Sequence, residues 1–313
     1  YEELKPDKMA YINLRARLAS EKGDKDQLRS LLKSLTPPSQ GGLDAKQLQQ
    51  VYGIAQLAAR YKDFELAEQL LRFYAKRIPA SIGALANFLA LHGDSDEAVE
   101  LMKQLFDRDK DAVLQLSTRM LRSRRSEIGD RFDETFEKMF SSAIREDPDS
   151  VARLTMHAEF LELQLDFEGS IQAYDKLLKR GDLSSKARAT ASNNLGFLLA
   201  LKGEQLEHAD ELVNEAMEIL GPIDDMLDTR AVVRIARQEY DLAVEDLTLA
   251  TSISQDPIKY YHLAKAHLLA GNDKAAQKAW SVALKREFKK DLLSLLEQKS
   301  FEDIEQRLES LRP

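Results

Sequence analysis

Alanines recur at a nearly constant interval in the last third of the chain. The first series is Ala209, Ala243 and Ala276, and the second, seven residues later in each copy, is Ala216, Ala250 and Ala283. Both series advance by 34 and then by 33 residues. One bulky residue lies between the two alanines of each copy: Val213, Leu247 and Trp280. Two series that keep step in this way indicate a structural unit that repeats along the chain.

Each copy has the spacing of two helices packed side by side, because residues three and four apart share one face of a helix. In the last copy the first helix carries Tyr260, Leu263, Ala264 and His267, and the second carries Ala276, Trp280 and Ala283. Small residues let the two helices approach closely, and bulky ones fill the space between them. One such hairpin cannot bury its apolar face alone, so the pattern predicts a stack of hairpins.

The pattern resembles the tetratricopeptide repeat (TPR), whose unit of about 34 residues is a helix–turn–helix. The last copy matches it well, and it departs at His267, where the family usually has an aromatic residue. The copy at 224–255 departs at Arg230 and Arg234, where leucine and tyrosine are expected. The resemblance implies an all-α, right-handed α-solenoid of about eight TPR-like repeats with a C-terminal helical cap.

Less regular copies of this pattern precede the last three, and the sequence predicts three parts. Residues 1–149 contain about four repeats, the fourth of them degenerate, and residues 150–287 contain about four more. Residues 288–313 lack the small packing residues, and we interpret them as capping helices over 291–297 and 301–311.

Two segments interrupt the repeats. The Pro- and Gly-rich segment 36–42 predicts a loop or a flexible joint. The segment 122–127 predicts an enlarged turn in the degenerate repeat. The basic cluster around this turn, Arg119, Arg122, Arg124 and Arg125, is interpreted as a solvated turn, with an acidic partner as the alternative.

The composition narrows the possible functions. Without cysteine, the chain has neither disulfides nor a cysteine-ligated metal. A net charge of -8 does not suit nucleic-acid binding, which needs basic surface. No apolar run reaches the roughly 20 residues that cross a bilayer, so direct membrane insertion is not expected. The start at Tyr1 favours a processed form or a fragment, and the compartment stays open, with the cytoplasm slightly favoured over the periplasm or export.

No motif for catalysis, nucleotide binding or metal binding is present. The sequence contains no glycine-rich phosphate loop, no Gly-x-Ser-x-Gly and no His-Glu-x-x-His. His262 and His267 are five residues apart, which does not align them on one helix face. The acidic pair Asp224 and Asp225 fits a helix start, where the dipole favours negative charge. We therefore predict no catalytic residue, no metal and no cofactor.

The resemblance to TPR proteins implies a ligand groove lined by the first helix of each repeat. Transferred position by position, this groove contains Asn193, Asn194, Phe197, Asp228, Tyr261, His262 and Lys265. Asn194 stands where peptide-binding members carry an asparagine that pairs with a ligand backbone. The positions that clamp a C-terminal carboxylate in the best-known subset hold Asn193, Thr229, Tyr261 and Lys265, so chaperone tails are disfavoured as ligands.

These observations predict a non-catalytic scaffold or adaptor that binds a protein or peptide in the groove. The alternative is a regulatory or substrate-recruiting TPR segment of a larger multidomain enzyme or membrane-associated assembly. A helical-repeat enzyme is a more distant possibility. Self-association also stays open, because an apolar groove or a terminal helix can bind a second copy.

Overall fold

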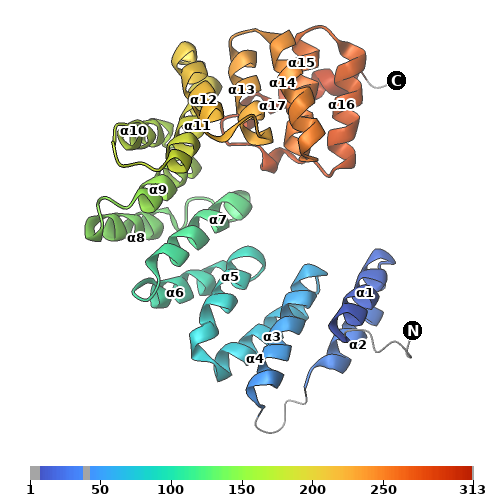
Figure 1. Cartoon of the computed structure of the whole chain (residues 1–313). Coiled ribbons are helices and arrows are strands. Elements are labelled where there is room, and N and C mark those ends of the chain that lie inside the picture. Colours follow the sequence, from blue (N-terminus) through green and yellow to red (C-terminus); the bar gives the residue numbers. More distant parts are fainter. Residues whose placement is uncertain (1–7, 38–42, 312–313) are drawn as a thin grey trace. The chain divides into compact units, whose positions relative to one another are not determined.

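The computed structural model describes residues 8–37 and 43–311. Within these ranges the chain forms seventeen α-helices and two short 3₁₀ helices, and no strand (Figure 1). None of the helices in the described ranges is long and apolar enough to cross a membrane. The predicted all-α fold is thus confirmed. The predicted joint lies mostly at 38–42, outside the described residues.

The helices form two compact units, of which unit 1 ends at Met139 and unit 2 begins at Phe140. Unit 1 contains α1 (Lys8–Glu21), α2 (Lys25–Leu35), α3 (Ala45–Arg60), α4 (Phe64–Arg77), η2 (Pro79–Ser81), α5 (Ile82–His92), α6 (Ser95–Phe106) and α7 (Lys110–Ile128). The boundary between the units falls inside α8 (Asp133–Glu146).

Unit 2 continues the alternation of helices. Its helices are α9 (Val151–Leu163), α10 (Phe167–Leu178), α11 (Ser185–Lys202), α12 (Leu206–Leu220), α13 (Asp224–Ala236), α14 (Tyr240–Ile253), α15 (Pro257–Leu269), α16 (Asp273–Lys285), η3 (Lys290–Leu292) and α17 (Gln298–Ser310). We call the side formed by α9, α11, α13 and α15 the first-helix face. The side formed by α10, α12, α14 and α16 is the second-helix face.

Short polar side chains start many of the helices. The carboxylates of Asp63 and Asp94 accept backbone N–H groups at the starts of α4 and α6, and Asp166 does the same for α10. Gly203 ends α11 with a φ of 70°, a left-handed conformation that costs glycine little. The turns between helices are therefore encoded locally.

The alanine series forms the contact between helices in unit 2. All six alanines of the two series are completely buried. Gly196 of α11 packs so closely on α12 that an added Cβ would lie 2.6 Å from Cγ2 of Val213 and 3.1 Å from the carbonyl oxygen of Ala209. The prediction that small residues allow close helix packing holds at these positions.

An ion-pair network explains why the copy at 224–255 departs from the repeat pattern. Arg230 donates two hydrogen bonds, of 2.9 and 2.7 Å, to the buried carboxylate of Asp246 on α14. Arg234 adds a third, of 2.5 Å. Guanidinium and carboxylate groups thus occupy the space between α13 and α14 that leucine and tyrosine would otherwise fill.

The chain after α16 differs from the prediction. The helix expected over 291–297 is wrong: this segment holds only the short turn η3 and an irregular bend. The helix expected over 301–311 is present as α17. The bend lets Phe288 and Leu293 enter one apolar cluster with Phe301 instead of lining one helix face.

The turn expected at 122–127 is also wrong, because α7 continues through it to Ile128 with a kink at Arg124 (φ -133°, ψ 15°). The kinked Arg124 donates from one guanidinium nitrogen to the carbonyl oxygens of Leu89 and Gly93, at 3.1 and 2.9 Å. A cation at these carbonyls satisfies the end of α5. Arg125 pairs with Asp133 at 2.5 Å. These two arginines therefore stabilise unit 1 rather than extend into solvent.

Candidate functional site

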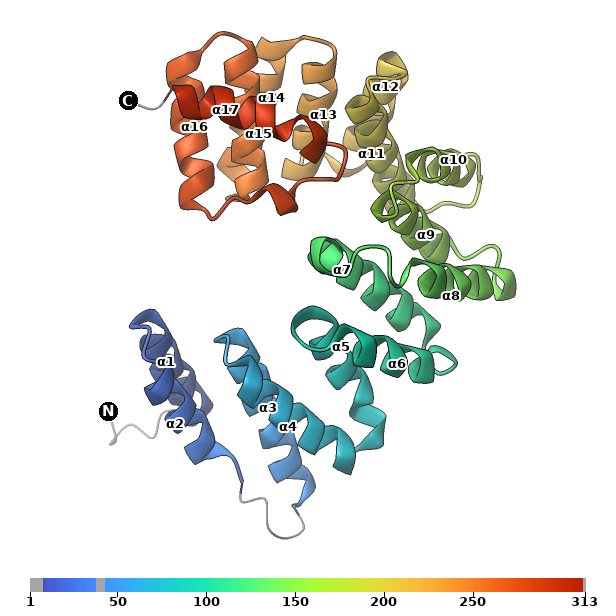
Figure 2. The same cartoon turned by 180° about the vertical axis from the view of Figure 1, so that it is seen from behind.

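Residues 286–311, which we call the C-terminal segment, return along the first-helix face of unit 2. Figure 2 shows α17 in front of α13 and α15, and the ring of Phe301 lies 5.5 Å from the ring of Tyr261 on α15. Two residues before Phe301, the segment also contacts α10, where the ammonium of Lys299 lies 5.5 Å from the ring of Phe167. The face predicted to bind a ligand thus carries part of the chain itself.

The segment is anchored by a buried acid–base cluster around His262. Its Nδ1 lies 2.8 Å from Oδ1 of Asp228 on α13, and its Nε2 lies 2.8 Å from Oε1 of Glu297 in the segment. The side chains of His262 and Glu297 are only 1% and 2% exposed. Burial alone lowers the pKa of His262, but the charges of Asp228 and Glu297 and the hydrogen bonds to them raise it to about 10. The ring is therefore a cation between two carboxylates at neutral pH.

Glu297 keeps its charge in this environment. Burial raises the pKa of Glu297, but His262 and Lys265 outweigh that effect and the net pKa lies below its usual range. Ser294 donates a hydrogen bond of 3.2 Å to the second oxygen of the same carboxylate. Glu297 is thus recognised by two cationic residues of α15 and by a hydroxyl of its own segment.

Aromatic rings surround the cluster. Tyr261 is fully buried and stacks on Phe288 at 5.0 Å, and its hydroxyl has no hydrogen-bond partner. Burial, and then the charges of Glu297 and Glu305, raise the pKa of Tyr261. Trp280 of α16 donates from Nε1 to Glu309 of α17 at 2.8 Å. The segment therefore combines one buried carboxylate with an apolar, largely aromatic contact.

The residues predicted from the groove pattern fall into two groups. The first group, Asp228, Tyr261, His262 and Lys265, comes together around Glu297. Tyr261 and His262 are buried there and not exposed in an open groove. Burial lowers the pKa of Lys265, and the charge of Glu297 partly offsets this effect.

The second group lies on α11. Asn194 donates a hydrogen bond of 3.0 Å to the hydroxyl of the buried Tyr174, so this amide already has a partner in the fold. Oδ1 of Asn193 is buried and unpaired. Phe197 is half-buried against the core of unit 2. A role of these residues in ligand binding stays a prediction.

Glu297 is the residue that the groove pattern did not identify. It follows the apolar run Leu292-Leu293-Ser294-Leu295-Leu296, and a lone carboxylate beside such a run is the one available signal. Its burial depends on the bend at 293–297, and helical periodicity contains no information about that bend.

The cluster does not have the arrangement of an acid–base catalyst or a metal site. Both ring nitrogens of His262 bond to carboxylates, which leaves no lone pair for a metal and no nitrogen for a substrate. No group of three metal-ligating side chains with suitable geometry occurs among the residues that the structure describes. The geometry supports recognition of a carboxylate.

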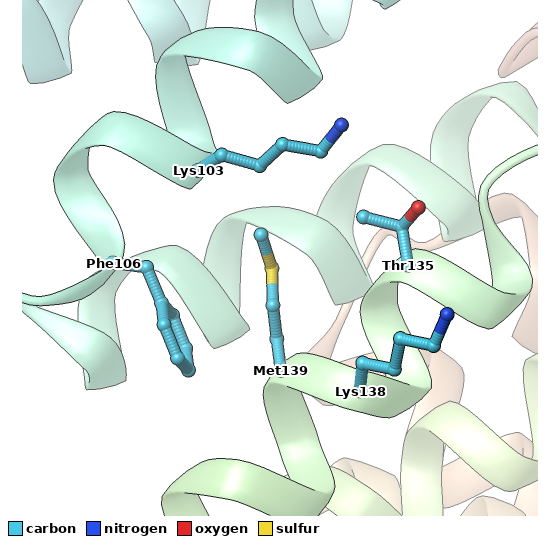
Figure 3. Close-up of a pocket in the computed structure, with 5 residues that line it drawn as sticks. All are labelled: Lys103, Phe106, Thr135, Lys138 and Met139. Atoms are coloured by element: carbon cyan, nitrogen blue, oxygen red, sulfur yellow. The ribbon is translucent and has the colours of Figure 1, made fainter.

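Unit 1 has a pocket of about 410 Å³ between α6 and α8. Lys103, Phe106, Thr135, Lys138 and Met139 line it, and Met139 lies between Phe106 and Lys138 (Figure 3). The ammonium groups are paired with Glu100 at 2.7 Å and with Glu134 at 2.5 Å. The lining is apolar with ion-paired lysines at its rim.

The comparisons with known proteins support the fold. No protein-family model matches the sequence, and no curated protein matches it significantly. A tetratricopeptide repeat protein from Parabacteroides merdae is similar in structure, with a TM-score of 0.60 and 14% identity over 85% of this chain and 99% of that one.

Two further structures are similar over nearly the whole chain. Yeast Tom70 has a TM-score of 0.58 and 15% identity, and the aligned region covers 96% of this chain and 58% of the Tom70 chain. The APC/C hetero-tetramer Cut9-Hcn1 has a TM-score of 0.51 and 14% identity, and 98% of this chain covers 61% of the chain compared. The chain thus spans less than two thirds of these two proteins. The predicted TPR resemblance is confirmed at the level of the fold.

Proposed function

We propose that this chain, which has the fold of a tetratricopeptide repeat protein, is a non-catalytic interaction scaffold that binds a protein or peptide on the first-helix face of unit 2. Helical repeats present extended faces to partners, and function depends on the site rather than on the fold. The proposal rests on one observation: a segment of the chain itself occupies this face and is held there by its carboxylate.

The C-terminal segment indicates which chemistry the face accepts. Glu297 meets His262 and Lys265, while Leu293 and Phe301 enter the apolar cluster around Tyr261. A partner would carry one carboxylate between large apolar side chains. Such a partner has to displace the segment, whose covalent connection gives it a high effective concentration.

A competition experiment tests this function. The full chain and its Glu297→Ala variant are titrated with a fluorescent peptide of residues 288–311, and binding is followed by anisotropy. Glu302→Ala is the matched control, because Glu302 lies in the same segment but is 80% exposed and pairs with Lys290 at the surface. We expect the peptide to bind Glu297→Ala at least tenfold more tightly than the wild type or the control.

Hydrogen exchange separates a binding face from a purely structural cap. In the Glu297→Ala variant, amides of the segment should exchange faster, while those of α11 and α12 should be unchanged. Faster exchange of the segment with no peptide binding would mean that the face serves only to bury the chain end. Equal weak binding to all three proteins would contradict the proposal as well.

A further inference from the structure

The second-helix face of unit 2 carries exposed apolar side chains that the fold does not use. Leu242, Leu249 and Ile253 are 43%, 47% and 54% exposed. They lie seven and then four residues apart on α14, so they form one stripe along the helix. The hairpin core does not need them, because α14 buries Ala243, Leu247 and Ala250 instead.

This stripe lies on the side of α14 that borders α12. Asp246 is on the same side as Leu242 and Leu249, four and three residues away, and it points to Arg230. Arg230 also donates to Asn214 of α12, at 3.4 Å. The side of α14 that carries the stripe therefore faces α12 across Arg230, and Ile223 of the connection between α12 and α13 is a further exposed apolar residue.

The helix that carries the stripe, α14, and the neighbouring α12 are acidic and contain no lysine or arginine. Their exposed carboxylates are Glu207, Glu211, Glu218, Asp241 and Glu245. Of these, only Glu211 has an ion pair in the part of the chain that the structure describes, with His208 at 3.6 Å. The nearest arginines are already engaged: Arg234 with Asp246, and Arg237 with Asp210 and Glu239.

We propose that the α12–α14 surface is a docking site for a cationic amphipathic helix of a partner protein. An apolar stripe of three residues matches the anchors of a helix of about four turns, which is about 20 Å long. The exposed carboxylates of α12 and α14 select lysine and arginine on the flanks of that helix. The proposal does not depend on ligand binding at the first-helix face.

A second copy presents α1, where the exposed Leu14 and Leu18 lie four residues apart beside the exposed Arg15 and Arg17. Dimerisation is therefore the outcome that the test below has to distinguish from binding of a partner helix. An anionic lipid surface would be repelled by the same carboxylates. A cationic partner helix satisfies both the apolar and the charged part of the surface.

The test is a titration of the full chain with a labelled 14-residue helical peptide of leucine and lysine, patterned so that leucine forms one face. Leu249→Ser/Ile253→Ser removes the apolar anchors, and Glu211→Gln/Glu218→Gln/Glu245→Gln removes three charges. Leu165→Ser is the control, since Leu165 is 51% exposed outside this surface. We expect each multiple variant to weaken binding at least tenfold, the control to bind as the wild type does, and affinity to fall with added salt.

Hydrogen exchange then locates the peptide, and protection is expected on α12 and α14. Protection confined to the C-terminal segment, or equal affinity in all proteins, would overturn the proposal. Dimerisation of the wild type that Leu249→Ser/Ile253→Ser abolishes would also overturn it, in favour of a second copy as the occupant. Failure here leaves the Glu297→Ala competition unaffected, so the two proposals are judged separately.

Discussion

Nε2 of His262 lies 2.8 Å from Oε1 of Glu297, which is 35 residues further along the chain. This contact joins α15 to the bend before α17, and Asp228 extends it to α13. The buried cation between two carboxylates fixes where the C-terminal segment crosses the first-helix face. Removing one member of such a cluster leaves an uncompensated charge in the interior, which is strongly destabilising.

The contact makes the stability of unit 2 depend on pH. The pKa of His262 is raised to about 10 in the fold from an ordinary 6.5, so its contribution is complete below about pH 6.5 and is lost as pH rises towards 10. The pKa of Glu297 is lowered from 4.5, so its contribution is present above about pH 4.5 and is lost on further acidification. The cluster is therefore most stabilising between about pH 4.5 and about pH 6.5.

The measurement compares urea midpoints of the wild type and His262→Gln from pH 5 to pH 9. We expect the wild type to lose stability relative to the variant as pH rises. Lys265 acts in the opposite direction, because its lowered pKa makes its burial less costly as pH rises. It is present in both proteins, so much of its effect cancels in the difference. A difference that does not change with pH would contradict a charged His262 in the fold.

Asp246 holds two arginines in the space between α13 and α14. We expect Asp246→Ala to cost about 3–5 kcal/mol, because Arg230 and Arg234 would then be partly buried without their carboxylate. The triple variant Arg230→Leu/Arg234→Tyr/Asp246→Leu restores an apolar contact and should be about as stable as the wild type. Chemical denaturation checks both, and a triple variant as unstable as Asp246→Ala would mean that the network has a role beyond charge pairing.

The sequence predicts those features of the fold whose contacts lie within one helical hairpin, and it does not predict contacts between residues that are far apart in the chain. The alanine series at 34-residue spacing predicts helix pairs because each contact repeats within one hairpin. Arg230 and Arg234 obscure the pattern, since the carboxylate that neutralises them lies on the following helix. The repeat pattern predicts that Tyr261 and His262 lie on the first-helix face. It does not predict that the C-terminal segment covers them. The return of residues 286–297 depends on tertiary packing alone, so no periodicity predicts Glu297.

Ala243 and Asn194 test which side chains face the interior. Ala243 is fully buried among Ala231, Leu247 and Ala266, so Ala243→Arg should cost about 3–5 kcal/mol through overpacking and a buried charge. Asn194→Ala should cost about 1 kcal/mol, because its amide bonds to the hydroxyl of Tyr174. Substituting a fully exposed asparagine with alanine would cost less unfolding free energy than this. Equal losses of unfolding free energy in the two variants would mean that Ala243 is not in the contact between helices.

Gly196 and Gly53 form a matched pair of helix glycines. A Cβ at Gly196 would lie 2.6 Å from Cγ2 of Val213, whereas a Cβ at Gly53 of α3 meets nothing within 4 Å. Gly196→Ala should therefore destabilise the chain by about 1–3 kcal/mol, because α11 and α12 must move apart. Gly53→Ala should stabilise it by about 0.5–1 kcal/mol, because alanine loses less backbone freedom in a helix. Calorimetry of the two variants checks these opposite signs, and stabilisation by both would show that α11 and α12 do not need a glycine at their contact.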